Sequence, residues 1–144
     1  MISAPRWSLH PQLANDTVTI GDLPLARVLV ANDANWPWLI LVPRRREVRE
    51  IVDLDEADQT QLMTEIARVS RALKAATACH KLNIAAIGNV VPQLHVHVVA
   101  RREDDAGWPK PIWGAAAPLA HDARELDRFV TAIKGKVWVA PEGS

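Results

Sequence analysis

Apolar and polar residues alternate, or apolar residues form short runs, in several stretches bounded by turn formers. Both patterns are typical of β-strands. The sequence predicts strands at 16–22, 25–31, 38–43, 82–88 and 93–101. The run "WLILVP" at 38–43 is apolar at every position, which is typical of a central strand covered on both faces. Short connections between the first three strands favour antiparallel pairing.

A different period governs two later segments, where apolar residues recur every three or four positions. The first segment predicts a long helix at 56–79, with Asp55 as its N-cap. Its buried stripe would consist of Leu62, Ile66, Val69 and Leu73. A capping-box pattern at Asp122 and Glu125 predicts a second helix at 123–134, ended by Gly135.

Between these helices, residues 102–118 contain three prolines and predict a long loop. The chain shows no repeat and no linker, so residues 1–144 are expected to form one domain. The predicted fold class is α+β: an antiparallel sheet of about five strands, one long helix packed on a face, and a C-terminal helix.

Composition narrows the possible partners. The chain has 17 basic and 17 acidic residues, so net charge gives no reason to expect nucleic acid or a membrane surface as partner. The single cysteine, Cys79, excludes an internal disulfide. The first residues lack the apolar stretch of a signal peptide, and no apolar run approaches the roughly 20 residues of a membrane span. A cytoplasmic location is therefore expected.

Two histidines stand one residue apart in the last predicted strand, "QLHVHVVAR". Because side chains alternate across a strand, Gln93, His95 and His97 are expected on one face. The other face is wholly apolar and is expected to pack into the core. Valine or threonine would favour a strand more than histidine, so the pair calls for another explanation.

Three interpretations of the pair remain open from spacing alone. The histidines can be structurally tolerated on a half-exposed face. They can form a metal-binding pair, although the third ligand would have to come from His10, His80, His121 or a carboxylate. They can also act on phosphorus, because neutral imidazole is a good nucleophile near pH 7.

The segment "QLHVHVV" resembles the signature of the histidine triad (HIT) superfamily, in which three histidines alternate with hydrophobic residues. "WLILVPRRR" and "LNIAAIGNVVPQLHVHVVAR" resemble the family's central strand and the region leading into its motif. The resemblance covers about residues 17–101 and implies an α+β fold. It extends to a bacterial branch described as HIT-like or diadenosine tetraphosphate hydrolase-like.

The resemblance implies a role for each motif position. His95 would attack the α-phosphate of a nucleotide and carry the nucleotidyl group transiently, and His97 would contact phosphate oxygens. Gln93 stands where the family has its first histidine. Its amide can orient His95 or bind a phosphate oxygen, but it cannot carry a proton. The alternative is a nucleotide-binding module with little or no turnover.

Three further positions are candidates for substrate binding by the same resemblance. Asn89 precedes the motif where the family often binds phosphate, although a turn after Gly88 also explains it. Asn32 lies where the family often meets the ribose, with Asp33 and Asn35 as competitors. Trp38 belongs either to the core or to the base pocket.

Other residues have two readings each. Trp108 and Trp113 in the proline-rich loop can stack on a base or bury the loop. Arg44, Arg45 and Arg46 can bind phosphate, but a solvated turn is the favoured reading. The expected partners are a nucleotide or dinucleoside polyphosphate and a second copy of the chain, with no cofactor and no metal in the protein itself.

Overall fold

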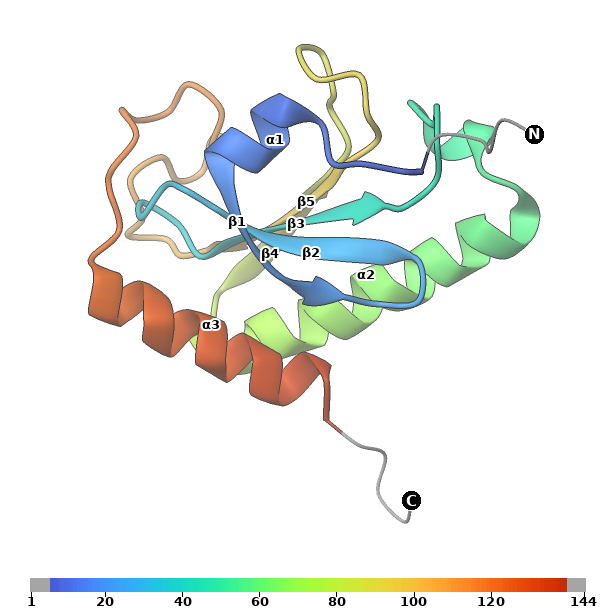
Figure 1. Ribbon diagram of the computed structural model, residues 1–144. Helices are drawn as coiled ribbons and strands as arrows, with labels where there is room; N and C mark the ends of the chain where they lie inside the picture. The colour runs from blue at the N-terminus through green and yellow to red at the C-terminus, as the bar shows by residue number, and fades with distance from the viewer. Residues whose placement is uncertain (1–5, 140–144) are drawn as a thin grey trace, which may run out of the picture.

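Five strands form one antiparallel sheet in a computed structural model that describes residues 6–139 (Figure 1). The sheet order is β1-β2-β3-β5-β4. The last strand of the chain, β5, therefore lies between β3 and the edge strand β4. The strands are β1 (Thr17–Asp22), β2 (Ala26–Ala31), β3 (Trp38–Pro43), β4 (Lys81–Ala85) and β5 (Val96–Arg101). The prediction of an antiparallel α+β sheet is confirmed.

Helices cover the two faces of the sheet unequally. Helix α2 (Glu56–Thr77) and helix α3 (Ala123–Val137) lie on one side, and the short helix α1 (Pro11–Asp16) lies on the other (Figure 1). A single 3-10 turn, η1 (Ile51–Asp53), precedes α2. Within residues 6–139, none of the helices is long and apolar enough to cross a membrane.

The main core lies between the sheet and helices α2 and α3. The apolar stripe predicted for the long helix is buried there, against the inward face of β5. That face consists of Val96, Val98 and Ala100, continued by Leu94 just before the strand. The opposite face of the sheet carries a smaller cluster around Leu29, Ile40 and Val42, on which Leu13 of α1 packs.

Helix α2 is also tied to the sheet through a buried carboxylate. Glu65 is only 2% exposed, and its two oxygens accept hydrogen bonds from the N–H groups of Leu25 (2.9 Å) and Ala26 (2.7 Å). The side chain of Gln61 donates a third bond of 2.6 Å. Every polar atom of this buried group therefore has a partner, as a buried charge requires.

Both helix starts agree with the sequence, but the ends differ. Asp55 caps α2 and Asp122 caps α3 through their carboxylates. Helix α2 ends at Thr77, two residues before the prediction. The prediction that Gly135 ends α3 is wrong, because the helix continues to Val137. Val137 is fully buried, and packing outweighs the modest cost of a helical glycine.

One further helix and two strands differ from the prediction. Helix α1 was not predicted, β4 spans Lys81–Ala85 rather than 82–88, and β5 begins at Val96 rather than at residue 93. Before Val96 the backbone leaves the ladder, and the N–H of Leu94 donates to the carbonyl of Val48 instead. The histidine motif thus straddles the start of a strand.

Candidate functional site

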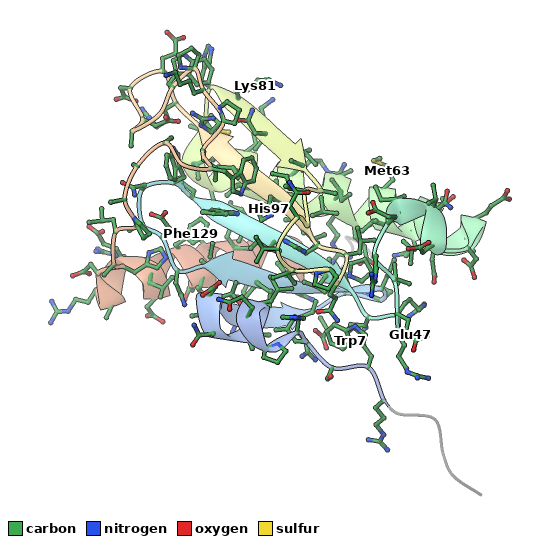
Figure 2. The ribbon with its side chains drawn as sticks, turned by 90° about the horizontal axis from the view of Figure 1, so that it is seen from above. Trp7, Glu47, Met63, Lys81, His97 and Phe129 are labelled. Carbon is green, nitrogen blue, oxygen red and sulfur yellow. The ribbon has the colours of Figure 1, made fainter. Side chains whose placement is uncertain are left out.

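A cavity of about 560 Å³ opens on the face of the sheet opposite α2. Its walls come from α1, the ends of β2 and β3, the 86–95 loop and the loop at 102–118. His97 lies over the middle of this face, seen from above in Figure 2. The side chains used below are Gln12, Asn15, Asp16, Asn32, Trp38, Asn89, His95, His97 and Trp113, all of which line the cavity.

The two motif histidines meet at the floor of the cavity. Their ring centroids are 4.9 Å apart with the planes tilted by 73°. Both residues are buried, with 7% of His95 and 6% of His97 exposed. His97 lies within β5, paired with Ile40 of β3 and Ala85 of β4, whereas His95 precedes the strand. The expectation that both imidazoles face the same side is therefore met.

A backbone carbonyl fixes the tautomer of His95. Its Nδ1 lies 2.8 Å from the carbonyl oxygen of Gln93. Because a carbonyl oxygen only accepts hydrogen bonds, Nδ1 must carry the proton. In the neutral ring, Nε2 then holds an unprotonated lone pair, which is the nucleophilic state of imidazole.

An indole fixes His97 in the opposite tautomer. The Nε1–H of Trp38 donates to Nδ1 of His97 over 3.0 Å, and an indole can only donate. The proton of neutral His97 therefore sits on Nε2. Burial, with a smaller contribution from the neighbouring His95, lowers the pKa of His97 to about 4. Near pH 7 this ring is neutral and is a hydrogen-bond donor through Nε2.

Gln93 does not lie where the sequence predicts. Its amide neither binds His95 nor lines the cavity. The Oε1 atom accepts from the N–H of His10 (2.9 Å), and Nε2 donates to the carbonyl of Ser8 (3.0 Å). The hydrogen bond between Gln93 and His95 comes from the backbone carbonyl of Gln93. The amide therefore bonds Ser8 and His10 rather than His95, and its binding of a phosphate oxygen stays a prediction.

The asparagine candidates are resolved by their neighbours. Asp33 accepts hydrogen bonds from Asn35 and from the N–H of Leu119, and Asn35 donates to the carbonyl of Ala117. These two competitors therefore hold the 117–119 segment, although Asp33 also lines the cavity. Asn32 lines the cavity, where its amide makes one long bond of 3.4 Å to the carbonyl of Asn15.

Asn89 also lines the cavity, on the loop that follows β4. It is exposed, lies at a bend of the chain and directly follows Gly88, which has a φ of +61°. Trp38 lines the cavity as well, with its indole against His97. The six site candidates therefore separate into five at the cavity and one, Gln93, beside it.

The two loop tryptophans have different surroundings. Trp113 lines the cavity with its ring centroid 5.0 Å from His97 and 6.3 Å from Trp38. Trp108 lies outside the cavity, 5.3 Å from His80 and 5.6 Å from the guanidinium of Arg101. One indole is thus available to a ligand, and the other helps to pack the loop.

A buried ion pair anchors that loop and was not foreseen from the sequence. Arg101 is 1% exposed, and its guanidinium binds both carboxylate oxygens of Asp105 at 2.8 and 3.1 Å. Its remaining nitrogen donates to Asn83 of β4 at 2.8 Å. Burial opposes ionisation of Asp105, but hydrogen bonds from Arg101 and from backbone N–H groups hold its pKa well below the usual range. The pair ties the loop to the end of the histidine strand.

The arginine run behaves as a turn rather than as a phosphate site. Arg44 donates to the carbonyls of Leu23 and Pro24, and Arg45 forms an ion pair of 2.7 Å with Asp58. Arg46 is exposed, and none of the three lines the cavity. The favoured reading from the sequence is confirmed.

The remaining histidines lie away from the motif pair. His80 faces Glu103 at 3.2 Å, and Nε2 of His121 contacts the carbonyl of Ala31 at 2.8 Å. His10 caps α1 by accepting from the N–H of Gln12. Over residues 6–139, no three His, Cys, Asp or Glu side chains gather where a metal ion would fit. The third ligand that the metal interpretation requires is not brought to the pair.

The fold is similar to solved structures of bacterial proteins. The fold superposes on a histidine triad protein from Bradyrhizobium japonicum, with a TM-score of 0.92 and 64% identity over 93% of this chain and 100% of that one. A histidine triad protein from Sinorhizobium meliloti gives a TM-score of 0.88 and 42% identity, over 90% of this chain and 96% of that one.

Among curated proteins, the chain is 33% identical over 127 residues to a Mycobacterium tuberculosis protein named AP-4-A phosphorylase. The match covers 81% of this chain and 64% of the relative, so the chain spans less than two thirds of that protein's length. The HIT domain family matches residues 12–104, which is more than half of the chain and includes the motif. The chain belongs to the HIT family.

Proposed function

We propose that the protein processes nucleotides by breaking the bond at the α-phosphorus of a dinucleoside polyphosphate, with His95 as the nucleophile. The observation that carries this proposal is the pair of opposite tautomers. Nε2 of His95 holds a lone pair, whereas Nε2 of His97 holds a proton. A nucleophile and a hydrogen-bond donor, 4.9 Å apart between ring centroids, suit one phosphoryl group.

In the first step, Nε2 of His95 attacks the α-phosphorus in line with the leaving group. The new N–P bond forms as the P–O bond to the leaving phosphate chain breaks, and the leaving oxygen keeps the electron pair. The positive charge that develops on the ring is stabilised through Nδ1–H, which donates to the Gln93 carbonyl. The Nε2–H of His97 donates to a phosphoryl oxygen.

The low pKa of His97 favours one substrate class over another. With its pKa lowered to about 4, this ring holds no second proton near pH 7 and is a poor general acid. A nucleoside di- or triphosphate leaves as an anion without needing a proton. The amine of a nucleoside phosphoramidate does need one, so dinucleoside polyphosphates are favoured. Similarity to a protein named AP-4-A phosphorylase supports the same class.

In the second step, an acceptor attacks the nucleotidyl-His95 intermediate and releases the histidine. Water as acceptor makes the enzyme a hydrolase, and inorganic phosphate makes it a phosphorylase. The cavity of about 560 Å³ falls in the usual range for a small-molecule site. Asn32, Asn89 and Trp113 supply polar and aromatic groups to its walls.

The test uses diadenosine tetraphosphate, adenosine phosphoramidate and a nucleotidyl sugar as a substrate panel. Wild-type protein should convert the tetraphosphate fastest and show a mass increase of one adenylyl group on His95. AMP with ATP as products indicates water as acceptor, and ADP with ATP in phosphate buffer indicates phosphate.

His95→Asn is the matched control and should show neither adduct nor turnover. The proposal is wrong if wild-type protein turns over the tetraphosphate without an adduct and His95→Asn is equally active. Tight AMP binding without turnover of any panel member would instead support the binding module.

A further inference from the structure

We infer that Gln93 is a positioning residue whose side-chain amide holds α1 in place as a wall of the substrate cavity. The inference rests on the proposed function only for its effect on catalysis, because the anchoring itself is a property of the fold. It gives a structural role to Gln93, which stands where the family's motif has its first histidine.

The amide of Gln93 pairs with the N-terminal segment as a strand residue pairs with a parallel neighbour. Nε2 donates to the carbonyl of Ser8 and Oε1 accepts from the N–H of His10, so the amide joins two residues two positions apart. In a parallel ladder, the N–H and C=O of one residue make the same exchange with two residues two positions apart on the neighbouring strand. The two bonds bridge more than 80 residues of sequence, from the N-terminal segment to the histidine motif.

The anchored segment leads directly into α1. His10 is the N-cap of the helix, and its Nδ1 accepts from the N–H of Gln12 at 3.0 Å. The opposite end of the helix has its own ties. Thr17 donates to the carbonyl of Leu13 at 2.6 Å, and the N–H of Asn32 donates to the carbonyl of Asp16 at 2.9 Å. The Gln93 amide is thus the polar tie at the start of the helix.

Helix α1 forms part of the cavity wall through Gln12, Leu13, Asn15 and Asp16. It has only six residues, too few to be stable without tertiary contacts. Leu13 is 5% exposed, and Leu9 just before the helix packs on the same apolar cluster. The polar tie at the helix start runs through the N–H of His10 to Gln93. Loosening this end therefore widens one wall of the cavity and leaves the histidine floor unchanged.

The chemistry of the tie explains why an amide suits the position. A primary amide presents a donor and an acceptor side by side in one plane. A neutral imidazole has one of each, but on different sides of a five-membered ring. A carboxylate accepts but does not donate. Gln93→Ala therefore removes both bonds. Gln93→Glu removes only the bond to the Ser8 carbonyl, because a carboxylate can still accept from the N–H of His10.

Hydrogen–deuterium exchange and steady-state kinetics with diadenosine tetraphosphate test the inference on the full chain. In Gln93→Ala, amides in residues 8–16 should exchange at least about tenfold faster, because losing two hydrogen bonds raises local opening by about that factor. Exchange in β5 should be unchanged. KM should rise by about tenfold with kcat within about twofold, the pattern of weakened uniform binding.

Gln93→Glu should show a smaller change of the same kind. Gln59→Ala is the matched control, because Gln59 also donates a side-chain amide hydrogen to a backbone carbonyl, that of Leu54, away from this cavity. It should leave exchange in 8–16 and both kinetic constants as in wild type.

Unchanged exchange in residues 8–16 of Gln93→Ala would overturn the anchoring. A fall in kcat at constant KM would overturn the positioning role and put Gln93 in the chemistry instead. If wild-type protein turns over no panel substrate, the proposed function fails, and the exchange data still decide the anchoring.

Discussion

The indole of Trp38 donates its only N–H to Nδ1 of His97, at 3.0 Å across neighbouring strands. The bond leaves the proton of neutral His97 on the nitrogen that can reach a ligand. It also occupies the nitrogen that would accept a second proton. Trp38, expected either in the core or in the base pocket, thus lines the cavity and sets the state of a motif histidine.

Removing this donor should change both the tautomer and the acidity of His97. In Trp38→Phe, the pKa of His97 should rise above about 4, because a donor to Nδ1 favours the neutral ring. Turnover of diadenosine tetraphosphate should fall by about tenfold, since the ring then populates both tautomers. Nitrogen-15 NMR of the imidazoles measures the tautomer and the pKa. Trp138→Phe is the control, because it removes an indole bond to the carbonyl of Asp22 on β1. The role assigned to Trp38 is wrong if both variants leave His97 unchanged.

Burial of His97 should make the fold less stable in acid. The folded-state pKa of about 4 lies below the ordinary value of 6.5, so the unfolded chain binds this proton more readily. The contribution is fully present above about pH 6.5 and is lost as pH falls towards 4. The shift corresponds to about 3 kcal/mol in the free energy of unfolding. Urea denaturation at pH 7.5 and 4.5 measures it, and His97→Gln should flatten this part of the pH dependence. An equal pH dependence in both proteins would contradict the assignment to His97.

The ion pair between Arg101 and Asp105 should matter far more than its exposed neighbour. Asp105→Asn leaves a guanidinium that is 1% exposed without its charge partner, at a cost of about 3–5 kcal/mol. The adjacent pair of Arg102 and Asp104 is mostly exposed, so Asp104→Asn should cost less than about 1 kcal/mol. Denaturation midpoints compare the two. Similar losses of stability in Asp105→Asn and Asp104→Asn would show that burial does not make the Arg101–Asp105 pair the more important one. Fluorescence of the loop tryptophans should change only in Asp105→Asn.

The buried carboxylate of Glu65 should not tolerate an amide. Glu65→Gln keeps the size but turns one acceptor into a donor that faces a backbone N–H, so one buried donor loses its partner. We expect a loss of about 2–3 kcal/mol in the free energy of unfolding. Glu56→Gln, in the exposed first turn of the same helix, should cost about 0.5 kcal/mol. A loss below 1 kcal/mol in Glu65→Gln would indicate that water reaches the site.

Helices and strands with one buried face could be predicted, because the spacing of their apolar residues distinguishes a helix from a strand. The stripe of α2 and the apolar face of β5 are examples, and their caps follow from residue chemistry at Asp55 and Asp122. Helix α1 escaped prediction because six residues show too little periodicity and because its N-cap is a histidine, which is not a usual capping residue.

The site was predictable where it depends on neighbours along the strand, and not where it depends on distant segments. Alternation brings His95 and His97 to one face. It also assigns Gln93 to that face, but the chain has left the ladder there and the amide turns to Ser8 and His10. Similarly, only contacts with residues 117–119 separate Asn32 from Asp33. Such tertiary bonds leave no periodic signal in the sequence.

The charge of the cavity wall has a consequence for how products leave. Among the described residues that line the cavity, Asp16 and Asp33 are carboxylates and none is lysine or arginine. A nucleoside monophosphate would therefore be held by neutral donors, with no ion pair to its phosphate. Its dissociation should therefore be fast, because no lysine or arginine of the described lining holds the phosphate. Chemistry at phosphorus, rather than escape of the product, would then limit the rate of turnover.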